Sequence, residues 1–465
     1  MKFLFIYPTS NLYELKTNKY IKNKAHLPPL GLLYISKILE NNGHKIEIID
    51  CNAEKLTTDK IKNKIKNFDV VGLSTFTKKR DRDFSIKIAK TIKEIDRNKT
   101  IIIGGPHATI LPELAIKEHQ ADICVIGQAE NVINMVAEAL EGKRELSTIP
   151  GIIYKNGTKF KKTKKRDLIE NLDDIPFPAR HLVEKYDYGY MFDVKFARGK
   201  VTTIITSRGC PHHCKFCSLR AVFPKYQERS LKDIYAEIDE IIEQGYKIIA
   251  FNDDNFIVNK KRIEKLMDYI ISKNADLKLW IYSARADSAD RKLFEKMRDA
   301  GVEYIFLGIE NGNQEILDYY NKKLDLSEVH KTVKLCKEMG FFVMGNFLFG
   351  APIEKRKHFE NTIKFAKSLN IDIANFYVLN YPIGSQIRKE AEKQGKIKKD
   401  EIYVDAGSEN GLSDFSKNEL ESYTEKAQRN FYFNPKFLLR GIYYSLKRKN
   451  FNLLKLGFKW VNSSF

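Results

Sequence analysis

The sequence lacks any hydrophobic run long enough to span a bilayer, and cysteine is scarce in it. The short apolar run in MKFLFIYP at the N-terminus is too short for a secretory signal, so we expect a buried strand there. Of the six cysteines, three lie within residues 210–217 and the others are scattered. This pattern excludes a disulfide framework and predicts a reducing, cytoplasmic compartment with a metal or cluster on the crowded cysteines.

Acidic residues are also outnumbered: the chain has 60 Asp and Glu and 80 Lys and Arg, which gives a net charge of +20. Such an excess is typical of proteins that bind nucleic acid or anionic membranes. Lysine far exceeds arginine and Ile and Asn are plentiful, so biased codon usage also explains the excess. No nucleic-acid-binding motif accompanies the charge, and we expect no nucleic-acid partner.

Up to about residue 140, short Val- and Ile-rich runs alternate with segments of helical periodicity. This alternation predicts βαβ units and a doubly wound parallel sheet, a Rossmann-like α/β domain. Ligands of such sheets bind at the carboxyl ends of the strands. The predicted strand ends carry small or turn-forming residues, which are Thr9, Ser10, Ser74, Thr75, Gly104, Gly105 and Gly127.

The pattern weakens over residues 141–195, which we interpret as a linker. YKNGTKF at 154–160 predicts a hairpin, because Asn-Gly favours a tight turn. The basic stretch 159–166 is expected to be a solvated connector. IPFPAR at 175–180 predicts a proline-stiffened domain boundary.

A second α/β series covers residues 196–385. Its strands are expected at 201–207, 247–252, 278–283, 303–310, 341–349 and 372–380, with helices between them. Six βα repeats are too few for an eight-stranded barrel and predict a partial (β/α)6 barrel. Residues 386–465 are expected to form a helical, basic and aromatic C-terminal region, either packed on the barrel or lying on anionic lipid.

The strongest chemical signal is Cys210-Pro-His-His-Cys214-Lys-Phe-Cys217, directly after the first strand of the second series. Three thiolates can bind three irons of a [4Fe–4S] cube and leave the fourth iron open. The alternative is a structural zinc site completed by His212 or His213. Closed zinc sites usually use two separated ligand pairs, and no second cysteine pair follows, so a cluster is favoured.

These residues resemble the radical S-adenosylmethionine superfamily, in the subgroup with an N-terminal cobalamin-binding domain. The resemblance covers nearly the whole chain. Its landmarks are RGCPHHCKFC, Arg229-Ser230, FNDDNF (251–256), YSARAD (282–287), GIENG (308–312) and GNFLFGAP (345–352).

The resemblance implies a site for S-adenosylmethionine, whose amino and carboxylate groups would bind the open iron. Phe216 would lie against the adenine through its backbone. The remaining assignments are Asp253 and Asp254 at the amino group, Ser283 and Arg285 at the carboxylate, and Glu310 at the ribose diol. The alternative is that Arg285 and Asp287 form an exposed ion pair and that Asp253 is an ordinary helix N-cap, but the places of these residues at strand carboxyl ends favour the site.

Residues 1–140 likewise resemble the cobalamin-binding module, through PPLGLLYISKILENNGHKIEIID (28–50) and IIIGGPHAT (101–109). Ser74 and the pair Gly104-Gly105 match its serine and double-glycine elements. The Asp-x-His-x-x-Gly element, whose histidine ligates cobalt in the typical module, is absent, so the lower cobalt ligand is unassigned. His107 and Glu130 complete the candidate cofactor-binding residues, although His107 is not expected to ligate cobalt, and Gly127-Gln128-Ala129-Glu130 replaces the usual Gly-Glu-x-Glu.

The function that the resemblance implies is methylation of an unactivated carbon, through a 5′-deoxyadenosyl radical and methylcobalamin. The alternatives are an oxidative cyclase or hydroxylase without net methylation and, with less support, an RNA-modifying enzyme. We expect a ferredoxin or flavodoxin as the low-potential electron donor. The basic aromatic C-terminus favours a lipid or isoprenoid-like substrate and peripheral attachment to the inner face of the membrane, while peptide, tetrapyrrole and natural-product substrates stay open.

Overall fold

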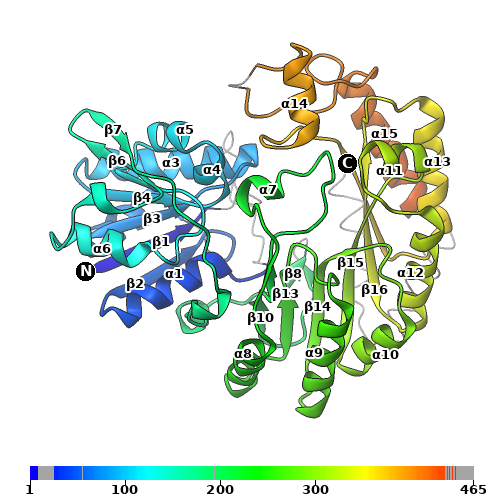
Figure 1. Ribbon diagram of the computed structural model, residues 1–465, viewed down its shortest axis with the longest axis horizontal. Helices are drawn as coiled ribbons and strands as arrows, with labels where there is room; N and C mark the ends of the chain where they lie inside the picture. The colour runs from blue at the N-terminus through cyan, green and yellow to red at the C-terminus, as the bar shows by residue number, and fades with distance from the viewer. Residues whose placement is uncertain are drawn as a thin grey trace. The chain divides into compact units, whose positions relative to one another are not determined.

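The computed structural model describes residues 1–8, 26–54, 56–191, 194–398 and 401–434, with the single positions 437, 439, 442 and 446. The chain divides into two compact units, Met1–Asp193 and Val194–Phe465. Each unit has its own sheet and its own hydrophobic core (Figure 1). Within the described residues no helix has the length and apolar character that a bilayer crossing needs.

The first unit is built on a seven-stranded sheet of order β2-β1-β3-β4-β5-β6-β7. The first five strands in this order are parallel. They are β1 (Lys2–Tyr7), β2 (Lys45–Asp50), β3 (Val70–Ser74), β4 (Thr100–Gly104) and β5 (Ile123–Val125). The reversal of strand order at β1 confirms the predicted doubly wound, Rossmann-like sheet.

Helices cover both faces of this sheet. Apolar side chains of α2 (Thr58–Ile65), α3 (Lys79–Ile95), α4 (Pro106–Ile110) and α5 (Pro112–Glu118) share one core cluster with strand residues such as Leu4 and Val71. The other two helices, α1 (Leu30–Asn41) and α6 (Ile133–Leu140), contact each other. The alternation of strands and amphipathic helices in the sequence is therefore a consequence of two buried sheet faces.

The predicted hairpin forms, as β6 (Ile152–Asn156) and β7 (Lys159–Lys162), but it does more than connect domains. Both strands pair antiparallel and extend the edge of the first sheet. Beyond β7, Arg166 reaches back to the carbonyl oxygen of Ile126 at 2.9 Å, so the basic stretch is only partly the solvated connector that we expected. The segment also holds η1 (Leu146–Thr148), η2 (Leu172–Asp174), η3 (Arg180–Val183) and β8 (Tyr190–Met191).

The second unit contains a six-stranded parallel sheet whose strands follow chain order, β10-β13-β14-β15-β16-β17. Chain-order pairing without closure is the arrangement of a partial barrel, as predicted. The strands are β10 (Val201–Ile204), β13 (Ile248–Phe251), β14 (Lys278–Arg285), β15 (Val302–Glu310), β16 (Phe342–Phe349) and β17 (Ile373–Val378).

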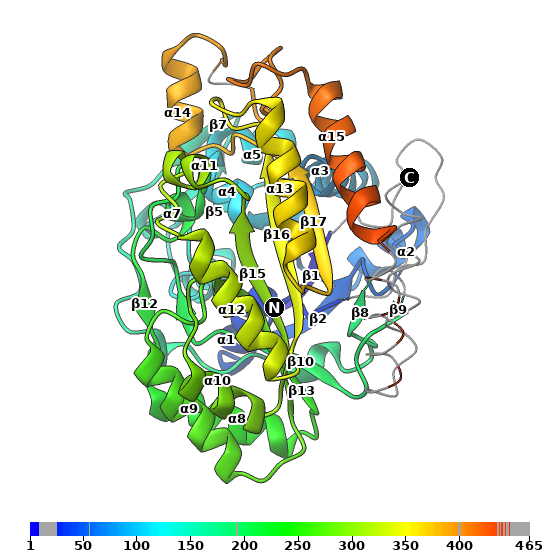
Figure 2. The ribbon, with the colours of Figure 1, turned by 90° about the vertical axis from the view of Figure 1, so that its right-hand side faces the viewer.

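Five helices pack along one face of this sheet, and Figure 2 shows α12 and α13 lying along β15–β17. They are α8 (Leu231–Glu243), α9 (Lys260–Ser272), α10 (Arg291–Asp299), α12 (Leu326–Glu338) and α13 (Arg356–Ser368). Side chains of Ser230, Asn259, Asp290 and Asp325 cap four of them at the N-terminus, which explains their sharp starts.

Smaller elements complete the second unit. These are β9 (Val194–Lys195), the ribbon of β11 (Ser207–Arg208) and β12 (Gln227–Glu228), and the helices α7 (Leu219–Val222), α11 (Gln314–Tyr319), α14 (Gln386–Lys393) and α15 (Lys417–Tyr432). The helices α14 and α15 agree with the predicted helical C-terminal region. The rest of that region lies mostly outside the described residues.

Candidate functional site

The three clustered cysteines lie on the loop between β11 and α7, and all three are free thiols that line one cavity of about 220 Å³. Cys210 and Cys214 are half-buried and Cys217 is exposed. Burial raises the pKa of the half-buried Cys214 thiol, so metal binding would release its proton.

This donor set fits an iron–sulfur cube with one open iron. Soft thiolates from a single loop face one cavity, and polar side chains from neighbouring strands form its other walls. His212 and His213 line the cavity as well, and the ring nitrogens of His213 lie 3.1 and 2.8 Å from the Arg220 guanidinium, which is also at the cavity.

Four of the five residues that we predicted around S-adenosylmethionine from successive strands line this same cavity. Asp254 follows β13, Ser283 and Arg285 lie on β14, and Glu310 ends β15. Parallel strands place their carboxyl ends at one edge of the sheet, which is why residues so distant in sequence meet here. Phe216 of the cysteine loop lines the cavity too, and its ring packs edge-on against Tyr320 at 5.2 Å.

The polar walls are held in place by hydrogen bonds. Asp254 accepts one from the Gly209 amide at 2.9 Å, and burial raises the pKa of its carboxyl to about 6. The Ser283 hydroxyl donates to the Asp254 carbonyl oxygen at 2.7 Å. Arg285 is buried and donates to Asp287 and to the carbonyl oxygens of residues 322 and 323, so it is not the exposed ion pair of the alternative interpretation.

Asp253 does not line the cavity, contrary to its predicted place beside the methionine amino group. Its carboxylate is 3% exposed and accepts hydrogen bonds from the backbone and hydroxyl of Thr206 and from the hydroxyl of Ser207. These bonds tie the end of β13 to the strand that precedes the cysteine loop. The observed role of Asp253 is therefore to hold the loop that carries the cysteines.

Among the cavity residues that were missed from the sequence are Lys322, Asn255 and Asn346. The Lys322 ammonium lies 2.7 Å from the Glu310 carboxylate. Asn255 is 3% exposed, and neither end of its amide has a hydrogen-bond partner within the described protein. Asn255 lies within the FNDDNF landmark, which could have marked it as a site residue. Lys322 is followed by Lys323 in a lysine-rich chain, and nothing in the sequence distinguished it from a surface lysine.

In the first unit, the predicted cofactor residues gather at the carboxyl ends of β3 and β4. The Thr75 hydroxyl donates to the Gly104 carbonyl oxygen at 2.9 Å and accepts from the amide of residue 108 at 3.1 Å. Gly105 has φ +104°, and a Cβ there would lie 2.7 Å from the Thr75 carbonyl oxygen. A Cβ on Gly104 would meet no atom within 4 Å, so the backbone there is open to a flat ligand.

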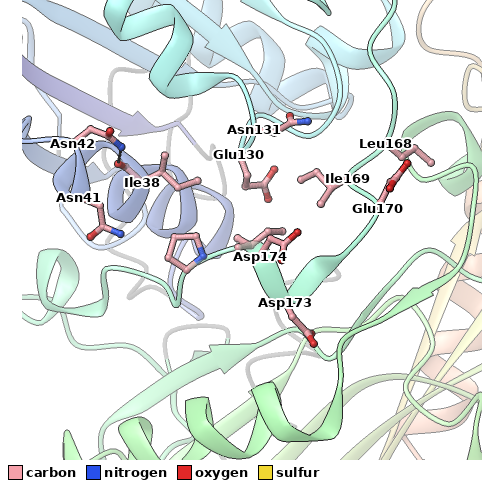
Figure 3. Close-up of a pocket in the computed structure, with 12 residues that line it drawn as sticks. Ile38, Asn41, Asn42, Glu130, Asn131, Leu168, Ile169, Glu170, Asp173 and Asp174 are labelled. Carbon is pink, nitrogen blue, oxygen red and sulfur yellow. Dashed lines mark hydrogen bonds between the residues drawn. The ribbon is translucent and has the colours of Figure 1, made fainter.

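The other predicted cobalamin contacts are less well placed. His107 is fully buried, and its Nε2 lies 2.5 Å from the Glu118 carboxylate, so it packs inside the unit instead of facing a ligand. Gly127 has φ +76°, and Thr9 and Ser10 lie outside the described residues. Glu130 lines a separate open cavity of about 620 Å³ with the carboxylates of Glu170, Asp173 and Asp174 (Figure 3), a lining unsuited to the phosphate of a cobalamin tail.

Comparison with known proteins agrees with both units. The model of the radical SAM superfamily matches residues 204–366, and that of the B12 binding domain matches residues 21–137. An uncharacterized methyltransferase of Pyrococcus horikoshii is 32% identical over 426 residues, which are 90% of this chain and 90% of that protein. An anaerobic magnesium-protoporphyrin IX monomethyl ester cyclase of Synechocystis is 28% identical over 324 residues, which are 68% of this chain and 63% of that protein.

Among solved structures, the radical S-adenosylmethionine methyltransferase TsrM from Kitasatospora setae, with cobalamin and a [4Fe–4S] cluster bound, has a similar fold. The TM-score is 0.67 at 17% identity, and the match covers 84% of this chain and 75% of that chain.

Proposed function

Since this chain belongs to the radical S-adenosylmethionine superfamily, among the members that carry a B12-binding domain, we propose that it methylates an unactivated carbon of its substrate. It is an enzyme, and its cofactors are a [4Fe–4S] cluster, S-adenosylmethionine and cobalamin. Like its superfamily, it acts on a substrate with the help of a reductant, for which we propose a ferredoxin or flavodoxin. We assign cobalamin binding to residues 1–140 and radical initiation to residues 196–385.

The observation that carries this proposal is the cavity shared by three free cysteines and polar residues from three strands. Cys210, Cys214 and Cys217 would hold the cluster. When bound, the cluster supplies the electron that cleaves S-adenosylmethionine, and cobalamin supplies the methyl group. Both cofactors are needed for this reaction, because an unactivated carbon has no lone pair with which to attack a methyl donor.

The chain's own residues would bind and orient S-adenosylmethionine. Asp254, fixed by the Gly209 amide, is suited to accept from the methionine amino group. Arg285 donates five hydrogen bonds, three to Asp287 and two to the carbonyl oxygens of residues 322 and 323, and it lines the cavity with Ser283 of the same strand. These two side chains are suited to the methionine carboxylate. Glu310 at the end of β15 offers a carboxylate to the two ribose hydroxyls.

Methylation is tested with S-adenosylmethionine that carries a deuterated methyl group, supplied to the cluster- and cobalamin-loaded enzyme with extracts of the source cells. The proposal predicts a product heavier by one labelled methyl group. The Synechocystis cyclase among the relatives supports the alternative, a cyclase or hydroxylase. A product whose mass changes by loss of hydrogen or gain of oxygen, without the label, would establish that alternative.

We further propose a lipid or isoprenoid-like substrate, reached by peripheral attachment of the cytoplasmic enzyme to the inner face of the membrane. Phe433, Leu439, Ile442 and Leu446 are all exposed, the last three at helical spacing. In this sequence no Asp or Glu follows Glu425, whereas nine basic residues do: Lys426, Arg429, Lys436, Arg440, Lys447, Arg448, Lys449, Lys455 and Lys459. Exposed apolar residues among basic ones suit an anionic lipid surface.

Sedimentation with vesicles tests this attachment. We expect binding to phosphatidylcholine vesicles that contain phosphatidylglycerol, weaker binding at high salt, and loss of binding in Leu439→Asp/Leu446→Asp. The matched control is Ile271→Asp, which replaces an apolar residue that is 40% exposed on α9. Equal sedimentation of the double variant and the control would exclude the C-terminal attachment.

A further inference from the structure

Lys322 is a buried lysine in the cavity of the cysteine loop, and no role has been given to it so far. Its side chain is 8% exposed, and its ammonium lies 2.7 Å from the Glu310 carboxylate, which is 10% exposed. Burial lowers the pKa of Lys322, but Glu310 and Cys214 together more than offset this and raise it above its ordinary value. A buried ammonium is costly without a partner of opposite charge, so the two side chains depend on each other.

The local backbone is shaped around this ion pair. Glu310 has φ +71°, and the pairing of β15 with β16 shifts register between Gly308 and Glu310, so a bulge turns the carboxylate toward the cavity. A Cβ at Gly308 would lie 2.6 Å from Glu310 Oε1 and 3.0 Å from Lys322 Nζ. A larger residue at this point would therefore displace the two charged ends from their present positions.

The turn that carries Lys322 is fastened to the cysteine loop. The side-chain amide of Asn321 donates to the backbone carbonyl oxygen of His213 at 2.9 Å, and the backbone amide of Lys215 donates to the carbonyl oxygen of Tyr320 at 2.9 Å. Asn321 and Lys323 have positive φ values of 51° and 49°, an uncommon conformation on both sides of Lys322. The ammonium itself lies 5.8 Å from the centre of the Phe216 ring. Phe216 stands between Cys214 and Cys217 in the sequence, so the charge is close to the cysteine loop.

We propose that Lys322 is a positioning residue for S-adenosylmethionine, which fixes the Glu310 carboxylate for the adenosyl group and places a positive charge beside the cysteine loop. The inference rests on the proposed function and on the ribose-binding role of Glu310. Two consequences follow from one cation. Loss of the ammonium releases Glu310 and weakens binding of S-adenosylmethionine, and it also makes reduction of the nearby cluster harder, because a positive charge stabilises the added electron.

The test compares Lys322→Met, Lys322→Arg and Glu310→Gln with wild type, all reconstituted without oxygen to equal iron content. Affinity for S-adenosylmethionine is measured by equilibrium binding, and the cluster potential by redox titration with electron paramagnetic resonance. We expect Lys322→Met to lose at least about tenfold in affinity, which is about 1.4 kcal/mol, and to have a more negative potential. Lys322→Arg restores most of both. The matched control is Lys323→Met, which removes an exposed lysine one position along the chain.

A double-mutant cycle separates positioning from a general structural effect. If Lys322 acts on binding through Glu310, adding Lys322→Met to Glu310→Gln lowers the affinity little further, while the shift in potential persists. Gly308→Ala displaces the pair without changing its charge, so it is expected to lower affinity and leave the potential near that of wild type. This variant also keeps the inference testable if Lys322→Met fails to fold.

Affinity of Lys322→Met within about twofold of wild type, or fully additive losses in the double variant, would overturn the inference. In that case wild type would still bind and cleave S-adenosylmethionine, so the proposed function would stand. Failure of cluster-loaded wild type to bind S-adenosylmethionine at all would instead count against the proposed function.

Discussion

The buried carboxylate of Glu354 illustrates what a single residue contributes at the ends of β15 and β16, where GIENG and GNFLFGAP lie. Glu354 is 1% exposed and accepts hydrogen bonds from the amides of Gly350 and Ala351 and from the side chain of Asn311. These bonds join GNFLFGAP to GIENG through one buried carboxylate. Burial nevertheless raises the pKa of the Glu354 carboxyl to about 7.

This raised pKa predicts how stability changes with pH. Between pH 4.5, where the unfolded carboxyl titrates, and about pH 7, the native state holds more protons than the unfolded state. The contribution of Glu354 to stability is therefore full below this window and falls as pH rises through it, by at most about 1.4 kcal/mol per pH unit. Urea unfolding across the window measures it, and Glu354→Gln is expected to have a shallower slope. Equal slopes in both proteins would contradict the assignment.

Asp253 allows a second test, because the sequence and the structure give it different roles. If it only holds the strand before the cysteine loop, Asp253→Asn loses about 1–3 kcal/mol of stability. Its affinity for S-adenosylmethionine, measured on folded, cluster-loaded protein, should stay near that of wild type. A loss of affinity without a loss of stability would restore the contact with the methionine amino group that the sequence predicted.

Strands and helices were the features that the sequence predicted best. The six strands of the second unit lie within a few residues of their expected positions, because buried parallel strands are continuous Val/Ile/Leu-rich runs. The hairpin was expected as well, but not its place at the sheet edge, since register depends on a distant strand. Lys322 was missed for a similar reason: its partner Glu310 is brought to it by a bulge and a short helix that no periodicity marks.

The double glycine after β4 gives a prediction for an element, the turn into α4. Gly105 has φ +104° and ψ −172°, a region open almost only to glycine. Gly105→Ala is expected to destabilise the first unit by about 1–3 kcal/mol, through this strain and the clash with Thr75. Gly104→Ala should unfold like wild type, because its Cβ meets no atom.

Cobalamin binding, followed by absorbance, completes this comparison. If the open side of Gly104 faces the corrinoid, Gly104→Ala retains less cobalamin although its stability is unchanged. Full retention of cobalamin by Gly104→Ala would contradict the assignment of the double glycine to the cofactor.

For the whole molecule, the proposed chemistry assigns one half of the reaction to each compact unit. The first unit has a doubly wound sheet matched by a B12-binding family, and the second has a chain-order sheet with the cysteine cavity. Separate cores explain how the sequence alone predicted two α/β series. The substrate could not be predicted in the same way, because it depends on surface shape and side-chain chemistry that backbone periodicity does not record.

The central claim is that the three cysteines hold a cluster that cleaves S-adenosylmethionine, and one measurement tests it most directly. Wild type and Cys214→Ala are purified and reconstituted without oxygen, their metal content is determined, and 5′-deoxyadenosine is measured after addition of S-adenosylmethionine and a low-potential reductant. Wild type should contain iron and sulfide and form 5′-deoxyadenosine, whereas Cys214→Ala should form none above background. Zinc in place of iron in the wild-type protein, or no 5′-deoxyadenosine from protein with a verified cluster, would contradict the claim.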